Sequence, residues 1–386
     1  MSTSAFTTPT DARARVQDAP GAHQLTDWNP ARTRDQLQRH IYGRLPDLSC
    51  LALTDVTPLG DVGARLVVEV WRFRVEAGGT DLDLAALMVR PSQAPTHTVL
   101  FAQCFRPHLG SLDGWTRALR GERTRPSLTG RVREIILGRH IHTPPFERVA
   151  AAGVGLFLFY PADLVPDHRQ ACRPILEALS GAEASTERGG VLAHWAAITI
   201  ALRGQLAAHF PNAAHVAWGH SRHGKAALLA AAFDPGFDAV IAHQSGRYGA
   251  AMTDGARGET VAQIVRAFPH WFCERMSVEQ GRGCEVDQQH LLALLAPRPI
   301  LLSGARADFW ADHAGAVRAG QSAAQILGAG GLTAYPDTSG AVVSFERPGW
   351  HGVTGEDWRC FLDFLGAKFR RAISAGDKAS AATGQA

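Results

Sequence analysis

Three residue types that together could perform nucleophilic catalysis follow one another along this sequence: a serine, an aspartate and a histidine. Ser221 lies in the stretch GHSRHG, residues 219–224, directly after an apolar run. Asp308 follows the run RPILLSGA, and His351 follows SFERPGW. A serine hydroxyl is a weak nucleophile, so it needs an imidazole to accept its proton and a carboxylate to orient that imidazole. We therefore predict a nucleophile at Ser221, a base at His351 and an orienting acid at Asp308.

Each of these assignments has an alternative that the sequence leaves open. A serine between glycines after a strand can simply form a tight turn. The chain contains 17 histidines, so a single histidine is more often a surface or core residue than a catalytic one. Asp308 could be an exposed turn or helix-cap aspartate, and Asp312 competes with it as the acid.

The residues around Ser221 predict a strand, a sharp turn and a helix. Residues 216–218 (VAW) end an apolar run typical of a buried strand, and residues 225–233 (KAALLAAAF) are typical of a helix that packs through small residues. The serine would lie at the turn between them. The chain order serine, acid, histidine is the order found in α/β-hydrolases.

The wider pattern predicts an α/β protein with a doubly wound, mostly parallel sheet flanked by helices, because short apolar runs alternate with helical stretches. A helical pattern covers residues 32–42, and two alternating runs, 65–75 and 82–90, predict an early antiparallel pair. The later runs lie at residues 97–105, 153–160, 215–219, 239–246 and 299–305.

Two long segments between these runs, residues 106–148 and 247–290, are rich in arginine, glycine, histidine and aromatic residues. Insertions at the carboxyl ends of strands form the ligand site in open α/β sheets, so we expect these segments to form it here.

Length and composition predict one catalytic domain over residues 25–373, because 386 residues with 46% hydrophobic side chains can form a large core. The polar ends, residues 1–24 and 374–386, are predicted to be disordered. The net charge of +3 is dispersed along the chain, which argues against a nucleic-acid partner. The oligomeric state is not predicted.

The remaining composition predicts no metal site, cofactor or membrane association. The six cysteines are scattered without a C-x-x-C pair, so they predict neither a zinc site nor a disulfide framework. The N-terminal residues contain no apolar signal core, and no apolar run is long enough to cross a bilayer. We therefore expect a cytoplasmic protein.

The stretch GHSRHGKAAL resembles the G-C/H-S-R-x-G-K signature of the glucuronoyl esterases and their bacterial relatives. Two residues separate Ser221 from Gly224, one more than in the usual G-x-S-x-G pattern, and this spacing belongs to that signature. Other stretches resemble bacterial members in the same order, over about residues 30–370: IYGRLP, FYPADLVPDH, GETVAQIVRAFPHWFC, DQQHLLALLAPRPILL, DFWAD and RPGWHGVTGEDW.

The resemblance implies roles for residues near the serine. In the family, the arginine after the serine stabilises the oxyanion, so Arg222 would supply a backbone N–H and a guanidinium. Lys225, one helical turn further on, would bind sugar hydroxyls. Trp310 and Glu259 would contact the uronate ring, and Trp271 would line the site. The alternative for Lys225 is a solvated position on the helix surface. The alternative for Trp310, Trp271 and His270 is simple packing in the protein interior.

The sequence departs from the best-known members of that family at Gln244, in the segment HQSG. Many members carry the catalytic glutamate at this position, and an amide cannot stabilise an imidazolium as a carboxylate does. The acid must then come from the next strand, which supports Asp308. We expect Gln244→Ala to have little effect, and Gln244→Glu to restore part of the rate to an Asp308→Asn variant.

These observations together predict a serine esterase that resembles glucuronoyl esterases and cleaves esters of a uronic acid, glucuronate, through an acyl-enzyme. Its partner would be a small-molecule or oligosaccharide ester. Two alternatives stay open: an esterase for acetylated sugars or alkyl or aryl esters, and a non-catalytic binding protein with the same fold.

Overall fold

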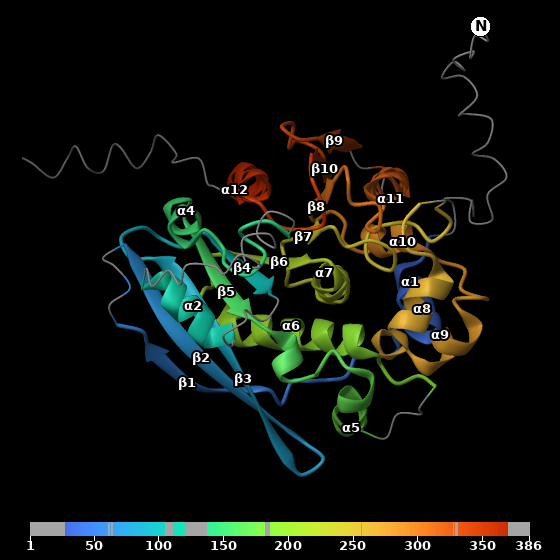
Figure 1. The fold of residues 1–386 in the computed structure, drawn as a ribbon, viewed down its shortest axis with the longest axis horizontal. Helices are drawn as coiled ribbons and strands as arrows, with labels where there is room; N and C mark the ends of the chain where they lie inside the picture. Colours follow the sequence, from blue (N-terminus) through green and yellow to red (C-terminus); the bar gives the residue numbers. More distant parts are fainter. Residues whose placement is uncertain are drawn as a thin grey trace, which may run out of the picture.

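The computed structural model describes residues 28–369, except 61, 63–64, 105–110, 121–136, 182–185, 256, 327 and 329–330. A ten-stranded sheet forms the centre of this part of the chain, in the order β1-β2-β3-β5-β4-β6-β7-β8-β10-β9. Helices cover both of its faces (Figure 1). The two ends that the sequence predicts to be disordered, residues 1–24 and 374–386, lie outside the described residues, so that prediction is not tested, and neither are the predicted domain bounds.

The strands from β5 to β9 in this order run parallel to one another, and β1, β2 and β3 form the antiparallel edge. This arrangement confirms the predicted α/β class and mostly parallel sheet. The strand bounds are β1 Ala52–Pro58, β2 Leu66–Ala77, β3 Thr80–Pro91, β4 Thr98–Gln103, β5 Val154–Phe159, β6 Ala214–His220, β7 Ala239–His243, β8 Ile300–Ala305, β9 Leu332–Ala334 and β10 Val342–Arg347.

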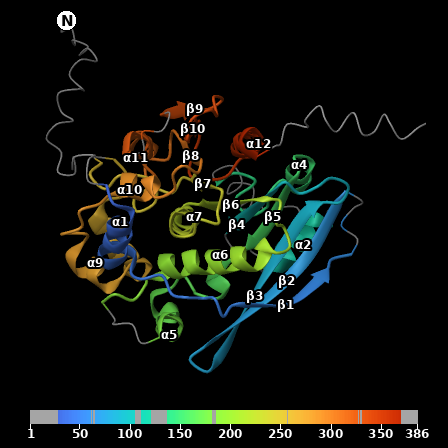
Figure 2. The same cartoon turned by 180° about the vertical axis from the view of Figure 1, so that it is seen from behind.

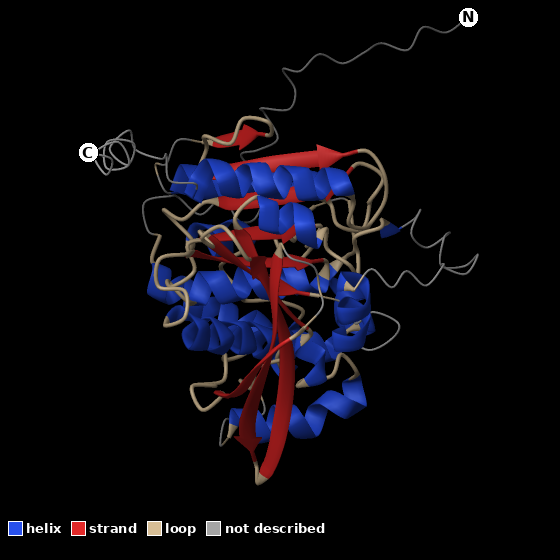
Figure 3. Ribbon diagram, turned by 90° about the vertical axis from the view of Figure 1, so that its left-hand side faces the viewer, coloured by secondary structure: helices blue, strands red, loops and turns tan. Residues whose placement is uncertain are grey.

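The predicted early antiparallel pair is the long hairpin of β2 and β3, in which Leu66 pairs with Pro91 and Ala77 with Thr80. Figure 2 shows this hairpin extending past the rest of the sheet. Figure 3 shows that the strand direction rotates strongly from one end of the sheet to the other, as the right-handed twist of strands requires.

The helices pack on the two faces of the sheet through two separate hydrophobic clusters. One face packs against α1, α6, α7, α10 and α11, and the other packs against α2, α4 and α12 (Figure 1). The helix bounds are α1 Pro30–Leu37, α2 Ser111–Leu119, α4 Phe146–Ala151, α5 Arg169–Ser180, α6 Val191–Ala207, α7 Arg222–Phe233, α8 Val261–Ala267, α9 Glu274–Glu279, α10 Gln288–Ala293, α11 His313–Ile326 and α12 Gly355–Phe369. Shorter helical turns are η3 Gln38–Tyr42, η4 Pro161–Asp163 and η5 Pro269–Trp271.

The order of the strands indicates where along the sheet a ligand is expected to bind. From β4 the chain passes to β5 on one side, and it later returns to β6 on the other side of β4. Ligands of open α/β sheets bind at the carboxyl ends of strands beside such a reversal of direction. The strand that ends at this point is β6, and Ser221 follows it directly.

Candidate active site

Ser221 lies at a sharp turn between β6 and α7, as predicted. Its φ angle is 59°, a left-handed backbone conformation that costs a non-glycine residue about 1–3 kcal/mol. The helix begins at once, because the backbone N–H groups of Gly224 and Lys225 donate to the carbonyl of Ser221 at 2.9 and 3.2 Å. This is the strained strand-to-helix turn that presents a nucleophile in α/β-hydrolases.

The two glycines of the GHSRHG stretch allow this turn to pack closely. A Cβ atom on Gly219 would lie 2.2 Å from the carbonyl oxygen of His223. A Cβ atom on Gly224 would lie 2.9 Å from the carbonyl oxygen of Gly219. Because α7 starts against its own strand, both positions need a residue without a side chain. Two residues after the serine complete the first turn of α7, which accounts for the spacing of the second glycine.

Asp308 and His351 lie against each other in the structure. The Nδ1 atom of His351 is 2.6 Å from the Oδ2 atom of Asp308. The Asp308 side chain is 1% exposed, whereas the His351 side chain is 36% exposed. An ionised carboxylate can only accept, so this pair holds the imidazole proton on Nδ1 and leaves the lone pair on Nε2 to accept a proton.

Asp312, the competing acid, lies elsewhere. Its Oδ1 atom accepts from the backbone N–H of Gly315 at 3.0 Å, at the start of α11. Among the hydrogen bonds of the described residues, none joins Asp312 to His351. The geometry therefore favours Asp308 as the acid that orients His351.

Backbone hydrogen bonds join the loop that carries Asp308 to the loop that carries His351. The N–H groups of Arg306 and Ala307 donate to the carbonyls of Arg347 and Gly349 at 2.8 and 3.0 Å. These loops follow β8 and β10, which pair directly. The acid and the histidine are thus held by neighbouring strands, although 43 residues separate them along the chain.

Buried side chains fix the remainder of the His351 loop. The guanidinium of Arg347 donates to the carbonyls of Pro348 and Gly352 at 2.9 and 2.6 Å, and to Asp357 at 2.7 Å. His243 also bonds the carbonyl of Gly352, at 2.8 Å. A loop with so many of its carbonyls bonded holds its histidine in one orientation. Arg347 and His243 could not be predicted as part of the site, because nothing in their local sequence indicates their partners.

Gln244 is buried at the end of β7, beside the same loop. Its Oε1 atom accepts from the backbone N–H of Gly352 at 2.8 Å and lies 3.0 Å from Nε2 of His220. Its Nε2 atom donates to the carbonyl of Trp350 at 3.2 Å. The Gln244 side chain therefore binds the backbone on both sides of His351.

Arg222 begins α7 and is half-buried. Its guanidinium forms an ion pair with Asp167 and lies over the rings of Phe268 and Trp271, 5.4 and 5.0 Å from their centroids. A guanidinium that is paired and stacked in this way has a fixed position beside the serine turn.

Asp167 organises the residues around Arg222. Its Oδ1 atom accepts from the indole N–H of Trp271 at 2.7 Å and lies 3.0 Å from Nε2 of His270. Burial opposes its charge, but the bond from His270, the charge of Arg222 and the bond from Trp271 together hold the pKa of Asp167 well below its ordinary value. Asp167 lies in the stretch FYPADLVPDH, but its role was not predicted, because its partners Arg222, His270 and Trp271 are distant in the sequence.

Trp271 is a buried residue whose ring and N–H both have partners. Its ring stacks on Phe268 at a centroid distance of 3.9 Å, and its indole N–H is bonded to Asp167. The structure thus places it as a support for Asp167 and Arg222. A direct contact between Trp271 and substrate stays a prediction.

Lys225 is buried rather than solvated. Its Nζ atom donates to the carbonyls of Ser245 and Arg247, at 2.6 Å for Ser245. Burial lowers the pKa of Lys225 to about 7, against the raising effect of Glu259 and together with the lowering effects of Arg222 and Arg247. Two backbone carbonyls therefore compete with any sugar hydroxyl for this ammonium group.

Glu259 and Trp310 lie together at the surface near Lys225. The backbone N–H of Glu259 donates to the carbonyl of Trp310 at 3.4 Å. Burial raises the pKa of the half-buried Glu259, while Lys225 and Arg222 lower it. Trp310 is exposed, as are Phe309 and Trp350, so large aromatic side chains flank both Asp308 and His351 in the sequence. A role in binding a sugar ring stays a prediction for both Glu259 and Trp310.

The two long segments differ in how much of them the structure describes. Residues 247–290 contribute Glu259, Phe268, His270 and Trp271, which lie around Lys225, Arg222 and Asp167. Much of 106–148 lies outside the described residues, so the prediction that it forms part of the site is not tested.

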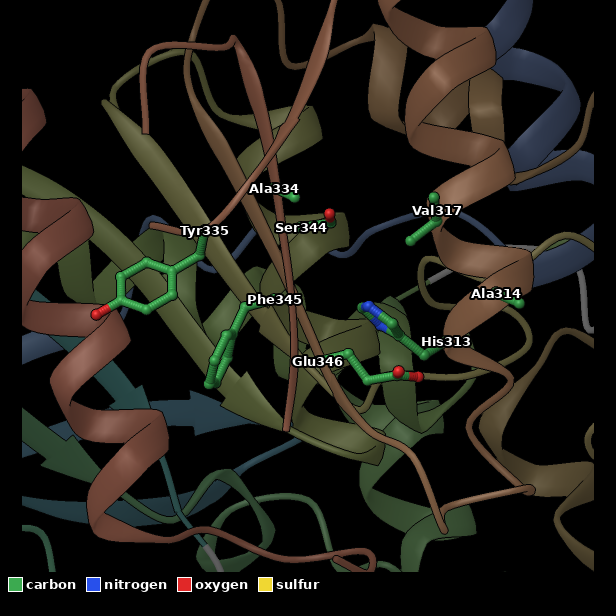
Figure 4. Close-up of a pocket in the computed structure, with 8 residues that line it drawn as sticks. All are labelled: His313, Ala314, Val317, Ala334, Tyr335, Ser344, Phe345 and Glu346. Carbon is green, nitrogen blue, oxygen red and sulfur yellow. The ribbon is translucent and has the colours of Figure 1, made fainter. Parts of the chain in front are cut away.

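A cavity of about 510 Å³ lies between α11, β9 and β10 (Figure 4). His313, Tyr335 and Glu346 are among the side chains that line it, and none of the predicted site residues does. The described residues contain no group of three or more histidine, cysteine, aspartate or glutamate side chains placed to hold a metal ion. None of the described helices is long and apolar enough to span a membrane.

Sequence comparisons match the central part of the chain. The model of a family described as glucuronyl esterase, fungi, matches residues 194–331, a range that contains Ser221 and Asp308 and ends before His351. Carbohydrate esterase MZ0003, from an unknown prokaryotic organism, is 42% identical over 157 residues, which are 38% of this chain and 36% of that relative. The match thus spans just over a third of the relative's length.

Solved structures match almost the whole described chain. A glucuronoyl esterase from Solibacter usitatus has a TM-score of 0.71 and 25% identity, covering 89% of this chain and 92% of that one. A CE15 glucuronoyl esterase from Teredinibacter turnerae T7901 has a TM-score of 0.71 and 22% identity, covering 90% and 86%. A promiscuous CE15 esterase from a marine bacterial metagenome has a TM-score of 0.70 and 24% identity, covering 89% and 92%.

The fold and the serine turn define an α/β protein of the hydrolase type. Taken with the sequence matches, they confirm the resemblance to the glucuronoyl esterases that the motifs predict. The similar proteins are named as carbohydrate esterases and glucuronoyl esterases.

Proposed function

We propose that this protein is a serine esterase that hydrolyses esters of a uronic acid, glucuronate in the first instance, through an acyl-enzyme. One observation carries the proposal: a buried aspartate, Asp308, bonds Nδ1 of His351 at 2.6 Å, and the centroid of the His351 ring lies 4.5 Å from that of His220, the residue before Ser221. The similarity to glucuronoyl esterases supports the choice of substrate class.

In the proposed reaction the Ser221 hydroxyl oxygen attacks the ester carbonyl carbon while Nε2 of His351 takes its proton. Asp308 holds the proton on Nδ1 and stabilises the imidazolium. The negative charge on the carbonyl oxygen is stabilised by the backbone N–H of Arg222, at the start of α7, and by its guanidinium. His351 then protonates the departing alcohol, and an acyl-enzyme remains.

A water molecule completes the cycle. His351 removes a proton from this water, whose oxygen attacks the acyl carbon, and the uronic acid leaves as Ser221 regains its proton. In this reaction the sugar acid is the acyl part, so its ring lies beside the serine. Glu259, Lys225 and the exposed Trp310 are the residues we propose to contact that ring.

The experiment that tests this proposal is turnover of an ester panel: methyl glucuronate, acetylated xylo-oligomers and nitrophenyl acetate. We expect the highest kcat/KM on methyl glucuronate. Higher kcat/KM on the acetylated or nitrophenyl esters would identify an esterase of another substrate class. A protein without turnover that also resists a fluorophosphonate would be a binding protein. Action in the cytoplasm stays a prediction that this panel does not address.

Ser221→Ala is the control for that panel. Alanine has the same Cβ atom as serine, so the strain at φ 59° is unchanged and the fold is expected to persist. We expect a loss of several orders of magnitude in kcat, because the nucleophile is removed, with an unchanged free energy of unfolding. Retention of more than a few per cent of the activity would contradict the assignment of Ser221.

A further inference from the structure

Gln244 occupies an unusual place for an uncharged side chain. It directly follows β7, is 3% exposed, and has a positive φ of 47°. Its backbone N–H donates to the carbonyl of Ser303 at 2.8 Å, so its position is tied to the end of β8 as well. A buried amide at a strained position persists only where the surrounding structure determines it closely.

The amide of Gln244 bonds three groups around His351. Its oxygen accepts from the N–H of Gly352, the residue after the histidine, and its nitrogen donates to the carbonyl of Trp350, the residue before it. Its oxygen also accepts from Nε2 of His220, at 3.0 Å. The His220 ring in turn packs against the His351 ring, with 4.5 Å between their centroids.

We propose that Gln244 is a positioning residue for His351: its amide holds the backbone on both sides of the histidine and the ring of His220 beneath it. This inference rests on the proposed function of Ser221 and His351 as nucleophile and base. It assigns Gln244 a function of its own at the position where the sequence suggests only a missing acid.

The three contacts require an amide rather than a carboxylate. A glutamate could accept from Gly352 and His220, but an ionised carboxylate has no donor for the carbonyl of Trp350. Two electron-rich oxygens would then face each other at about the present separation of 3.2 Å between Gln244 Nε2 and Trp350 O. The structure thus gives a physical reason for glutamine at this position.

The charge state of His220 gives a second reason. Burial, together with the neighbouring His351 and His243, lowers the pKa of His220 well below its ordinary value, so this ring is neutral and can donate from Nε2. A carboxylate at residue 244 would favour a charged His220. That charge would lie against His351, which must itself become an imidazolium during the reaction.

The same contacts change two expectations drawn from the sequence. The amide at residue 244 reaches the backbone of the His351 loop, while Nδ1 of the imidazole faces Asp308. A glutamate at 244 is therefore not placed to replace Asp308, and we expect no recovery from Gln244→Glu in an Asp308→Asn background. We also expect Gln244→Ala to reduce activity.

The size of the effect is limited by other bonds to the loop. The guanidinium of Arg347 also donates to the carbonyls of Trp350 and Gly352, at 3.3 and 2.6 Å. The loop should therefore stay folded without Gln244, while the histidine loses its alignment. A misplacement of a catalytic group by about 1 Å can cost on the order of 100-fold in rate.

The test compares Gln244→Met, which keeps the length but removes all three bonds, with Gln244→Glu. Gln205→Met is the matched control, since Gln205 also bonds a loop carbonyl, that of Leu51, at 3.0 Å, but on α6. With nitrophenyl acetate at neutral pH we expect kcat to fall about 10- to 100-fold in both Gln244 variants, with KM within about twofold. Gln205→Met should retain wild-type kcat.

The pH dependence distinguishes positioning from a general structural role. A protonated glutamate has one donor and one acceptor oxygen and so resembles the amide, and burial raises the pKa of a carboxyl group. The ionisable groups that face it are His220, His351 and Arg347. The kcat of Gln244→Glu relative to wild type should therefore rise as the pH falls, whereas the ratio for Gln244→Met should stay constant. Wild-type kcat in Gln244→Met, or a constant ratio for Gln244→Glu, would overturn the inference.

A measurement without turnover separates failure of this inference from failure of the proposed function. Hydrogen exchange at the Gly352 N–H should become faster in Gln244→Met and remain unchanged in Gln205→Met. If wild-type protein hydrolyses no ester, the proposed function fails, and this exchange still tests whether Gln244 holds the loop. Unchanged exchange at Gly352 would contradict the inference whatever the activity.

Discussion

Asp308→Asn changes one atom of the proposed triad, and the structure determines how the new amide would be oriented. The Oδ1 atom of Asp308 accepts from the backbone N–H of Ala311 at 3.3 Å, and Oδ2 faces Nδ1 of His351 at 2.6 Å. The asparagine oxygen is expected to keep the bond from Ala311. Its NH₂ group would then face Nδ1, which must become an acceptor.

The consequence is a change of tautomer. If Nδ1 accepts, the imidazole proton lies on Nε2, and Nε2 can no longer accept the proton of Ser221. The Asp308 side chain is only 1% exposed, so water cannot replace the lost carboxylate. Loss of the orienting acid in serine hydrolases lowers kcat by about 10⁴. We expect a loss of about 10³ to 10⁴, or about 4 to 5.5 kcal/mol of transition-state stabilisation.

The assay is steady-state hydrolysis of nitrophenyl acetate, combined with the rate at which a fluorophosphonate labels Ser221. We expect KM to change by less than about threefold, and both kcat and the labelling rate to fall together. Asp312→Asn is the control, because its Oδ1 atom bonds Gly315 rather than the histidine loop. Turnover near the wild-type rate in Asp308→Asn would refute this reasoning, and a large loss in Asp312→Asn would move the acid to that residue.

The remaining predictions concern two charged residues near the serine turn, Lys225 and Asp167. Lys225→Met should lower kcat/KM on methyl glucuronate more than on nitrophenyl acetate, and equal losses would mark Lys225 as structural. Because the pKa of Lys225 is lowered to about 7, the folded chain binds fewer protons than the unfolded chain above that pH. The wild-type free energy of unfolding should therefore rise with pH from about 7 toward the ordinary lysine pKa, by up to about 1.4 kcal/mol per pH unit. In urea titrations Lys225→Met should remove this rise. Asp167→Asn should cost about 2 kcal/mol at pH 7 and lower kcat through Arg222. Because the pKa of Asp167 is lowered in the folded chain, its charge stabilises the fold fully above the ordinary aspartate pKa, and this stabilisation is lost as the pH falls below that value. Acid should therefore destabilise the wild type more than Asp167→Asn. Parallel acid unfolding of the two proteins would contradict this prediction.

The parts of the fold that the sequence predicted are those determined by local pattern. Short, mostly apolar runs of five to nine residues are typical of strands buried on both faces, and the five such runs correspond to β4 to β8. The alternating runs at 65–75 and 82–90 marked the antiparallel pair at the sheet edge. The turn at Ser221 was predictable because glycines on both sides of a serine, between a strand and a small-residue helix, leave few other backbone paths.

The parts that the sequence did not predict depend on contacts between distant segments. The ion pair between Arg222 and Asp167 joins residues 55 positions apart. Helical spacing placed Lys225 on the side of the serine, but it could not show that the carbonyls of Ser245 and Arg247 would occupy its ammonium group. A side chain's direction follows from local geometry, whereas its partner follows from which other segments reach the same point.

The strand pairing explains how the acid and the amide divide their tasks. His351 lies four residues beyond the end of β10, and β10 pairs directly with β8. The loops that follow these two strands are joined by backbone hydrogen bonds, so an acid in the loop after β8 lies beside the imidazole. β7 lies one strand further away, and its own end pairs with β8 at His243 and Ser303. The residue after β7, Gln244, therefore reaches the backbone of the histidine loop at Trp350 and Gly352. The carboxylate of Asp308, after β8, faces Nδ1 of His351, where a negative charge stabilises the imidazolium. The amide of Gln244, after β7, faces the N–H of Gly352 and the carbonyl of Trp350, which require one acceptor and one donor.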